Sequence, residues 1–281
     1  MLSLAQKRSR LLLGLTLLLL VLLGLGSVFF RSESTPHLST LNSADASELH
    51  FELADGRAAA LQKRDDGWYL TAPWQRRADA SRVQVLLTVL TLPAPVVYSP
   101  DELAPAEAGL DKPAGVLNIN GTRFEFGRAD ATQRRRYVRS GDRIALLSDL
   151  AFPVMQQGAD YLADKQIFPP GMSAISTPAW QLEKTDGLWR SATLSTARAE
   201  TLVGRWLAIR AAAIVAWPLP AGRLPDSTEA IRVEVSNGSN TSGYSIYRLP
   251  DLTLIHRDDA DHALAIEADA ATALLEVPGD A

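Results

Sequence analysis

The sequence predicts an α+β fold, in which an N-terminal transmembrane helix precedes two similar units of antiparallel sheet with packed helices. Three observations predict it. One uncharged run near the N-terminus is long enough to span a membrane, the rest of the chain alternates short apolar segments with tight-turn signals, and the second half repeats the order of the first. Strands that meet as tight hairpins, with one helix before them and one after, give largely antiparallel sheets covered on one face by helices.

The membrane anchor is predicted at residues 11–30. This run has 20 residues, eleven of them Leu, and carries no charge, so as a helix it would cross ~30 Å of hydrocarbon. Lys7, Arg8 and Arg10 precede it, and the positive-inside rule therefore places residues 1–10 in the cytoplasm. A cleaved signal peptide is the alternative, because small residues such as Ser27 lie near a plausible cleavage point. The apolar region of a signal peptide has only ~7–15 residues, which favours the anchor.

The first α+β unit is predicted at residues 48–168, after a polar tether at residues 31–47. Asp66-Gly67 is a turn signal between two apolar segments, and Asn120-Gly121 is the strongest short hairpin signal in the chain. Helical periodicity at Val83, Leu86 and Leu90 predicts a helix between the strands. The expected strands are 49–53, 58–62, 68–70, 96–98, 116–119, 124–126, 137–139 and 144–147, and the expected helices are 78–92 and 149–157.

The second α+β unit is predicted at residues 179–281, after a linker at residues 169–178 that is rich in Pro and Gly. Leu61-Gln-Lys63 and Asp66-Gly67-Trp68 are matched by Leu182-Glu-Lys184 and Asp186-Gly187 followed by Trp189, at an offset of about 121 residues. Two copies of one unit explain the length better than two unrelated domains do. The expected elements are a helix at 199–209, strands at 231–235, 244–249, 252–256 and 263–266, and a closing helix at 269–275.

The composition excludes several classes of function. Cysteine is absent, which excludes thiol catalysis, disulfides, thiolate metal sites and lipid attachment through an N-terminal cysteine. The formal net charge is −4, and an acidic chain is poorly suited to binding nucleic-acid phosphates. Neither a glycine-rich phosphate loop nor a G-x-S-x-G nucleophile turn occurs. We therefore predict no catalytic residue, no cofactor and no metal site, and a protein that is not an enzyme.

The densest group of ligating side chains is the segment from His256 to His262, which contains two histidines and three aspartates. Such a group could bind a divalent cation, and an envelope hydrolase that uses either histidine is a further alternative. A hairpin turn is the favoured interpretation, because Asp is a common turn residue and the equivalent segment at 139–143 lacks histidine. His37 and His50 have no partner at a recognisable spacing and are interpreted as exposed and incidental.

Two further groups of residues have a structural and a functional interpretation. Arg134–Arg136, with Arg128 and Arg139 nearby, could bind anionic lipid or an acidic partner, but a strand edge protected by charge is favoured. Four tryptophans flank the two Asp-Gly turns and are interpreted as buried anchors rather than a sugar-binding surface. They are Trp68, Trp74, Trp180 and Trp189.

Several short motifs occur in a characteristic order between residues 49 and 165. They are Asp66-Gly67-Trp68, Pro73, the helix at 80–92, Gly109-Leu110 with Pro113, Phe126-Gly127 and Tyr137-Val138. This order resembles the bacterial family called domain of unknown function 4340. The resemblance implies a membrane-anchored extracytoplasmic protein that serves as an auxiliary component of a gliding-motility-type ABC transporter, and it supplies no catalytic residues.

The expected protein is thus a single-pass protein of a bacterial inner membrane, with a cytoplasmic N-terminus and a periplasmic C-terminal domain. Its expected function is that of a non-enzymatic accessory protein whose partner is an ABC transporter permease or another envelope protein. No nucleic-acid partner is expected. The alternative is a periplasmic ligand-binding module, with an envelope glycan or lipid in the cleft between the two units.

Overall fold

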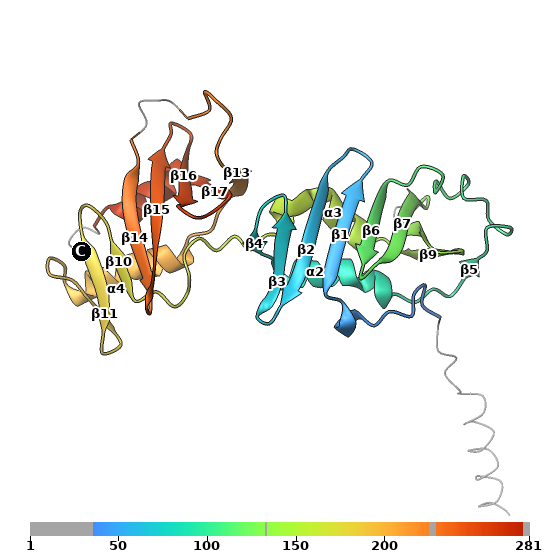
Figure 1. Ribbon diagram of the computed structural model, residues 1–281, viewed down its shortest axis with the longest axis horizontal. Helices are drawn as coiled ribbons and strands as arrows, with labels where there is room; N and C mark the ends of the chain where they lie inside the picture. Colours follow the sequence, from blue (N-terminus) through green and yellow to red (C-terminus); the bar gives the residue numbers. More distant parts are fainter. Residues whose placement is uncertain (1–35, 133, 225–228, 278–281) are drawn as a thin grey trace, which may run out of the picture. The chain divides into compact units, whose positions relative to one another are not determined.

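A computed structural model describes residues 36–132, 134–224 and 229–277 (Figure 1). The predicted cytoplasmic segment (1–10), the predicted anchor (11–30) and the first part of the predicted tether (31–35) lie outside the described residues. Among the helices in the described ranges, none is both long enough and apolar enough to cross a membrane. The described part is α+β with two antiparallel sheets, which confirms this much of the predicted fold.

The first sheet has nine strands in the order β4-β3-β2-β1-β6-β7-β8-β9-β5, and every neighbouring pair is antiparallel. All eight strands predicted in this unit are present, and the short β4 is additional. The strands are β1 (Glu48–Leu53), β2 (Ala58–Arg64), β3 (Gly67–Ala72), β4 (Arg76–Arg77), β5 (Val97–Tyr98), β6 (Gly115–Ile119), β7 (Thr122–Ala129), β8 (Arg135–Ser140) and β9 (Arg143–Ser148).

The β6–β7 turn shows why the Asn-Gly signal was informative. Asn120 and Gly121 have φ angles of 47° and 81°, the left-handed conformation that a two-residue hairpin turn requires and that these residue types tolerate best. The Asn120 carboxamide also accepts hydrogen bonds from the backbone N–H groups of Ser47 and Glu48, both at 2.9 Å, and donates to the carbonyl of Asp45 at 2.7 Å. One turn residue therefore also fixes the start of β1.

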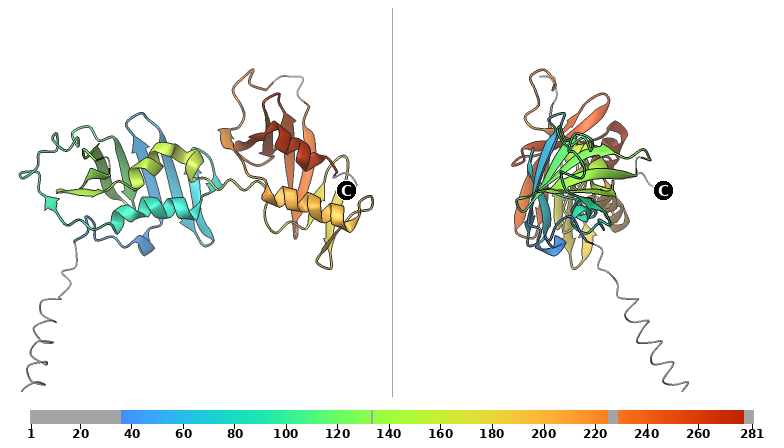
Figure 2. Two further views of the ribbon diagram at one scale, coloured as in Figure 1. Left: turned by 180° about the vertical axis from the view of Figure 1, so that it is seen from behind. Right: turned by 90° about the vertical axis from the view of Figure 1, so that its right-hand side faces the viewer.

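Two helices cover one face of the first sheet: α2 (Ala80–Leu87), which continues as the 3₁₀ turn η2 (Thr88–Leu90), and α3 (Ala151–Leu162) (Figure 2). The Asp79 side chain caps α2 by accepting from the N–H groups of Ser81 and Arg82. The inward residues of β1 alternate with outward ones, so that Leu49, Phe51 and Leu53 are buried. The core of this unit lies between that sheet face and the two helices.

The second sheet has eight strands in the order β12-β11-β10-β14-β15-β16-β17-β13. If β4 is set aside, this order equals that of the first sheet, with β10, β11 and β12 in the places of β1, β2 and β3, and β13 in the place of β5. The strands are β10 (Ala174–Ser176), β11 (Gln181–Thr185), β12 (Leu188–Arg190), β13 (Ala213–Ala216), β14 (Ile231–Asn237), β15 (Asn240–Arg248), β16 (Leu252–Arg257) and β17 (His262–Glu267).

The helices of the second unit are α4 (Thr196–Ala208), which follows β12, and α5 (Ala268–Leu275), which follows β17. In the first unit α2 follows β3 and the short β4, and α3 follows β9. Trp206 of α4 is fully buried, its ring centroid lies 4.3 Å from that of Phe168, and its Nε1 donates to the carbonyl of Leu274 at 2.9 Å. The four tryptophans beside the Asp-Gly turns are all buried, which confirms their interpretation as anchors.

The predicted unit boundaries stay predictions, but two segments can be located. Leu38 and Ala46, in the range assigned to the tether, are buried in the main core, and η1 (Ser43–Asp45) lies between them. β10 lies inside the range assigned to the linker and pairs with both β11 and β14.

Candidate functional site

One face of the first sheet is not covered by its helices, and we call the outward side chains of β1, β2, β6 and β7 the open face. Residues from Leu103 to Leu110 pack over the outward side of β9, where Ala108 and Leu110 bury Ile144. The open face is the remaining part (Figure 1). Across it, His50 pairs with Asn118, and Asn118 pairs in turn with Arg123.

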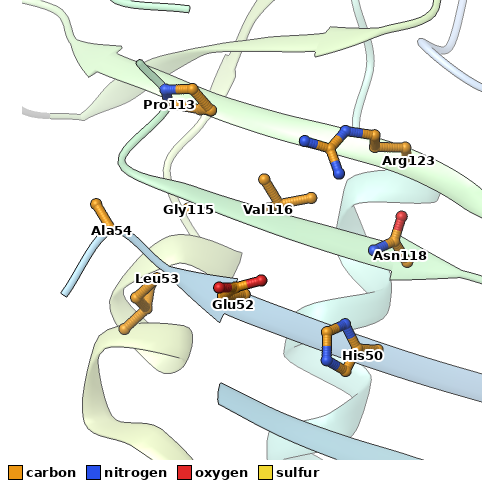
Figure 3. A pocket seen from close by; sticks show the side chains of 9 residues that line it. All are labelled: His50, Glu52, Leu53, Ala54, Pro113, Gly115, Val116, Asn118 and Arg123. Atoms are coloured by element: carbon orange, nitrogen blue, oxygen red, sulfur yellow. The ribbon is translucent and has the colours of Figure 1, made fainter. Parts of the chain in front are cut away.

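Two adjoining hollows of about 190 and 390 Å³ lie on the open face along β1 and β6. His50 and Asn118 line both of them. Figure 3 shows the smaller hollow, into which the side chains of Glu52 and Arg123 also project, while Gly115 and Val116 form part of its floor. The two hollows share His50 and Asn118, and we call them together the trough.

The trough carries charges of both signs. Arg123 donates from Nε to Glu125 at 2.9 Å, and Glu125 also pairs with Arg139. Partial burial raises the pKa of Glu125, but the hydrogen bonds from Arg123 and Arg139 outweigh it and hold the pKa below its ordinary value. Within the part of the chain that the structure describes, Glu48 and Glu52 form no ion pair and are exposed, so their carboxylates face solvent.

His50 lies on this surface because of the period of two in β1. Its neighbours Leu49 and Phe51 point to the helices, whereas Glu48, His50 and Glu52 point away from them. His50 was predicted to be exposed and incidental; it is exposed, and it lies beside Asn118 of β6. The alternation of β1 was the available signal, but the pairing of β1 with β6 spans about 70 residues and could not be read from spacing.

The interpretation of Arg134–Arg136 as a protected strand edge is wrong. β8 is an interior strand, because it is hydrogen-bonded to β7 on one side and to β9 on the other. Arg136 makes a largely buried ion pair with Asp149 at 2.9 Å, donates to the carbonyl of Gly127 at 2.6 Å, and lies 3.9 Å from the ring centroid of Phe152. This arginine is a core component of the first unit.

The segment from His256 to His262 is the β16–β17 hairpin, which confirms the favoured interpretation. His256 and His262 lie on opposite faces of the sheet, because His256 pairs with Ala263 and the side chains of a strand alternate. The His256 ring stacks on Trp217 with a centroid distance of 4.5 Å and donates from Nε2 to the carbonyl of Ala260 at 3.0 Å. Among the described residues, no three or more His, Cys, Asp or Glu side chains are placed to hold a metal ion.

His262 instead belongs to a cluster where the chain passes from the first sheet to the second. We call Trp74, Arg76, Asp164, Asp261 and His262 the junction cluster. Arg76 of β4 donates to the carbonyls of Asp164 at 2.6 Å and Gln166 at 2.5 Å, and its Nη1 lies 3.2 Å from Nε2 of His262.

The second unit meets the same segment through Asp261. Its carboxylate accepts from the backbone N–H of Gln75 at 3.0 Å and from Nδ1 of His262 at 2.8 Å. The His262 ring is buried, and its centroid lies 5.9 Å from that of Trp74. Sequence reasoning missed this cluster because its two sides are 186 residues apart.

Comparisons with family models, with curated proteins and with solved structures find no match to this chain.

Proposed function

We propose that this chain is a non-enzymatic accessory protein, anchored in a bacterial inner membrane by residues 11–30, which docks through the open face on a membrane-embedded partner. The observation that carries the proposal is the trough, a shallow and open surface with exposed carboxylates beside Asn118 and Arg123. Small-molecule sites usually bury most of their ligand in an enclosed and largely apolar cavity. A shallow open surface with mixed polar and apolar lining is better suited to another protein, because a non-obligate protein–protein interface is about as apolar as the rest of a protein surface.

The sequence supports the same proposal independently. The uncharged run at residues 11–30 would hold the two sheet units close to the membrane, and its basic N-terminal flank would place them in the periplasm. The resemblance to the family of domain of unknown function 4340 points to an ABC transporter permease of the gliding-motility type as the partner. The equal strand orders of the two sheets support the further proposal that the units are copies of one ancestral unit.

The test is purification of the full-length protein from membranes in a mild detergent, followed by mass spectrometry of the bound proteins. Reversing two trough charges, with Glu52→Lys and Arg123→Glu together, is expected to remove the partner while leaving the fold intact, because both side chains are exposed. Gln84→Glu is the matched control, since Gln84 is an exposed residue of α2 in the same unit. Equal recovery of the partner with all three proteins would refute docking through the trough.

The larger hollow favours one second candidate, a periplasmic ligand-binding module for an envelope glycan or lipid. Its volume of about 390 Å³ is within the range of small-ligand sites, and amide and carboxylate groups such as Gln62, Asn120 and Glu48 line it. Thermal melting of the full-length protein with envelope glycans and lipids separates the candidates, because a bound ligand raises stability by mass action. A ligand-dependent rise that Asn118→Ala removes would favour the ligand-binding module.

A further inference from the structure

The junction cluster contains a buried histidine in contact with a permanent cation, and this arrangement has a defined protonation state. A guanidinium only donates hydrogen bonds, so Nε2 of His262 must accept from Nη1 of Arg76 across 3.2 Å. The ring proton is then on Nδ1, which donates to the Asp261 carboxylate at 2.8 Å. The contact therefore needs the neutral imidazole.

Protonation of His262 would remove this contact. The added proton would be on Nε2, which faces Arg76, and two donors with like charge would then lie 3.2 Å apart. Among the described residues, the other titratable groups that act on the pair are Arg257 at the end of β16, Tyr244 of β15, Asp164 next to β4, and Asp261 in the β16–β17 turn. Asp261 favours the imidazolium, whereas burial, Arg76 and Arg257 disfavour it, and together these outweigh the carboxylate.

The neighbours of this contact tie the β16–β17 hairpin to the first unit and to the segment between α3 and β10. Arg76 binds the carbonyls of Asp164 and Gln166 in the connecting segment, and Asp261 binds the backbone of Gln75. Trp74 packs beside the His262 ring. Loss of the Arg76–His262 contact would therefore weaken the attachment of the β16–β17 hairpin to the first unit while leaving each unit's own sheet and core intact.

We propose that His262 is an acid-sensitive latch between the two sheet units, closed by neutral His262 on Arg76 and released when the imidazole is protonated. The latch is independent of the proposed docking function, because none of its residues lines the trough. It would change how the two units are held without unfolding either one.

The test measures the distance between the units in the full-length protein in detergent. The chain has no cysteine, so Asp65→Cys and Ser239→Cys, which change one exposed residue in each unit, allow spin labelling without background. Pulsed electron–electron double resonance measures the distance between the two labels. The distance distribution is expected to be narrow at pH 7.5 and broader at pH 5. His262→Gln, which retains a neutral acceptor but does not titrate, is expected to remain narrow at both pH values.

His256→Gln is the matched control, because His256 is a second buried histidine of the same hairpin but lies on the opposite sheet face. It should broaden in acid as the unsubstituted protein does. An unchanged distribution at pH 5, or equal broadening with His262→Gln, would overturn the proposal. If His262→Gln does not fold, the ring ¹⁵N resonances of His262 in the unsubstituted protein test the proposal instead. The midpoint of their pH titration should coincide with the midpoint of the broadening of the distance distribution. A separate midpoint would refute the latch.

Discussion

Replacing Arg136 by Met is expected to destabilise the first sheet unit by about 3–5 kcal/mol, the cost of leaving one partner of a buried ion pair uncompensated. The side chains of Arg136 and Asp149 are only 13% and 7% exposed, so water cannot replace the lost partner at the carboxylate. The Gly127 carbonyl also loses its 2.6 Å hydrogen bond. Methionine keeps most of the contact with Phe152, so the expected cost is mainly electrostatic.

Urea unfolding of the full-length protein in detergent, followed by circular dichroism, measures this change. Arg135→Met is the control, because Arg135 is the exposed neighbour on the same strand, and its expected effect is within about 0.5 kcal/mol. The double variant Arg136→Met with Asp149→Leu removes both charges and should be more stable than Arg136→Met alone. A loss below about 0.5 kcal/mol for Arg136→Met would refute the reasoning and favour a surface role for the arginine run.

Three further predictions follow from burial and backbone geometry. Gly204→Ala should stabilise α4 by about 0.5–1 kcal/mol, because the added Cβ meets open space. Gly127→Ala should destabilise the first unit by about 1–3 kcal/mol, because its Cβ would lie 2.1 Å from the Ala108 carbonyl oxygen. Urea unfolding should show changes of opposite sign in the free energy of unfolding of the two variants. Trp206→Ala should cost about 3–5 kcal/mol, and an unchanged urea midpoint would contradict its place in the core. Burial, opposed by Asp261 and reinforced by Arg76, lowers the pKa of His262 below its ordinary value of 6.5. The stability that the neutral ring contributes is therefore complete above pH 6.5 and is lost as the pH falls through and below that value. Between pH 7.5 and pH 5, the melting temperature should fall less for His262→Gln than for the unsubstituted protein.

Local patterns predicted most of the fold because its strands are joined by short hairpins. Turn residues such as Asn120-Gly121 and the alternation of β1 are encoded within a few residues, and the order of elements could be followed through both halves. β10 and β13 were missed because strands of three and four residues carry too little alternation, and their pairing with β14 and β17 fixes them instead. The helix predicted at 149–157 continues as α3 to Leu162 past Gly158, whose φ is 77°.

The candidate sites depend on contacts between distant residues and were largely invisible in the sequence. The trough requires β1 to lie beside β6, and the junction cluster requires β4 to meet β17. The arginine run was misinterpreted because the neighbours of a strand in the sheet decide whether that strand is an edge, and β8 lies between β7 and β9. Arg136 instead forms an ion pair with Asp149, which follows β9 in the chain. The trough, the junction cluster and the place of the arginine run all depend on contacts between residues far apart in the sequence.

Site-specific photocrosslinking in intact cells tests the docking proposal most directly. A photoreactive amino acid placed at position 50, in the trough, should form a covalent adduct with a membrane protein, and mass spectrometry of the adduct should identify an ABC transporter permease or another envelope protein. The same amino acid at position 84, on the exposed side of α2, should form no such adduct. Adducts at position 84 but none at position 50, with equal amounts of both proteins in the membrane, would contradict docking through the open face.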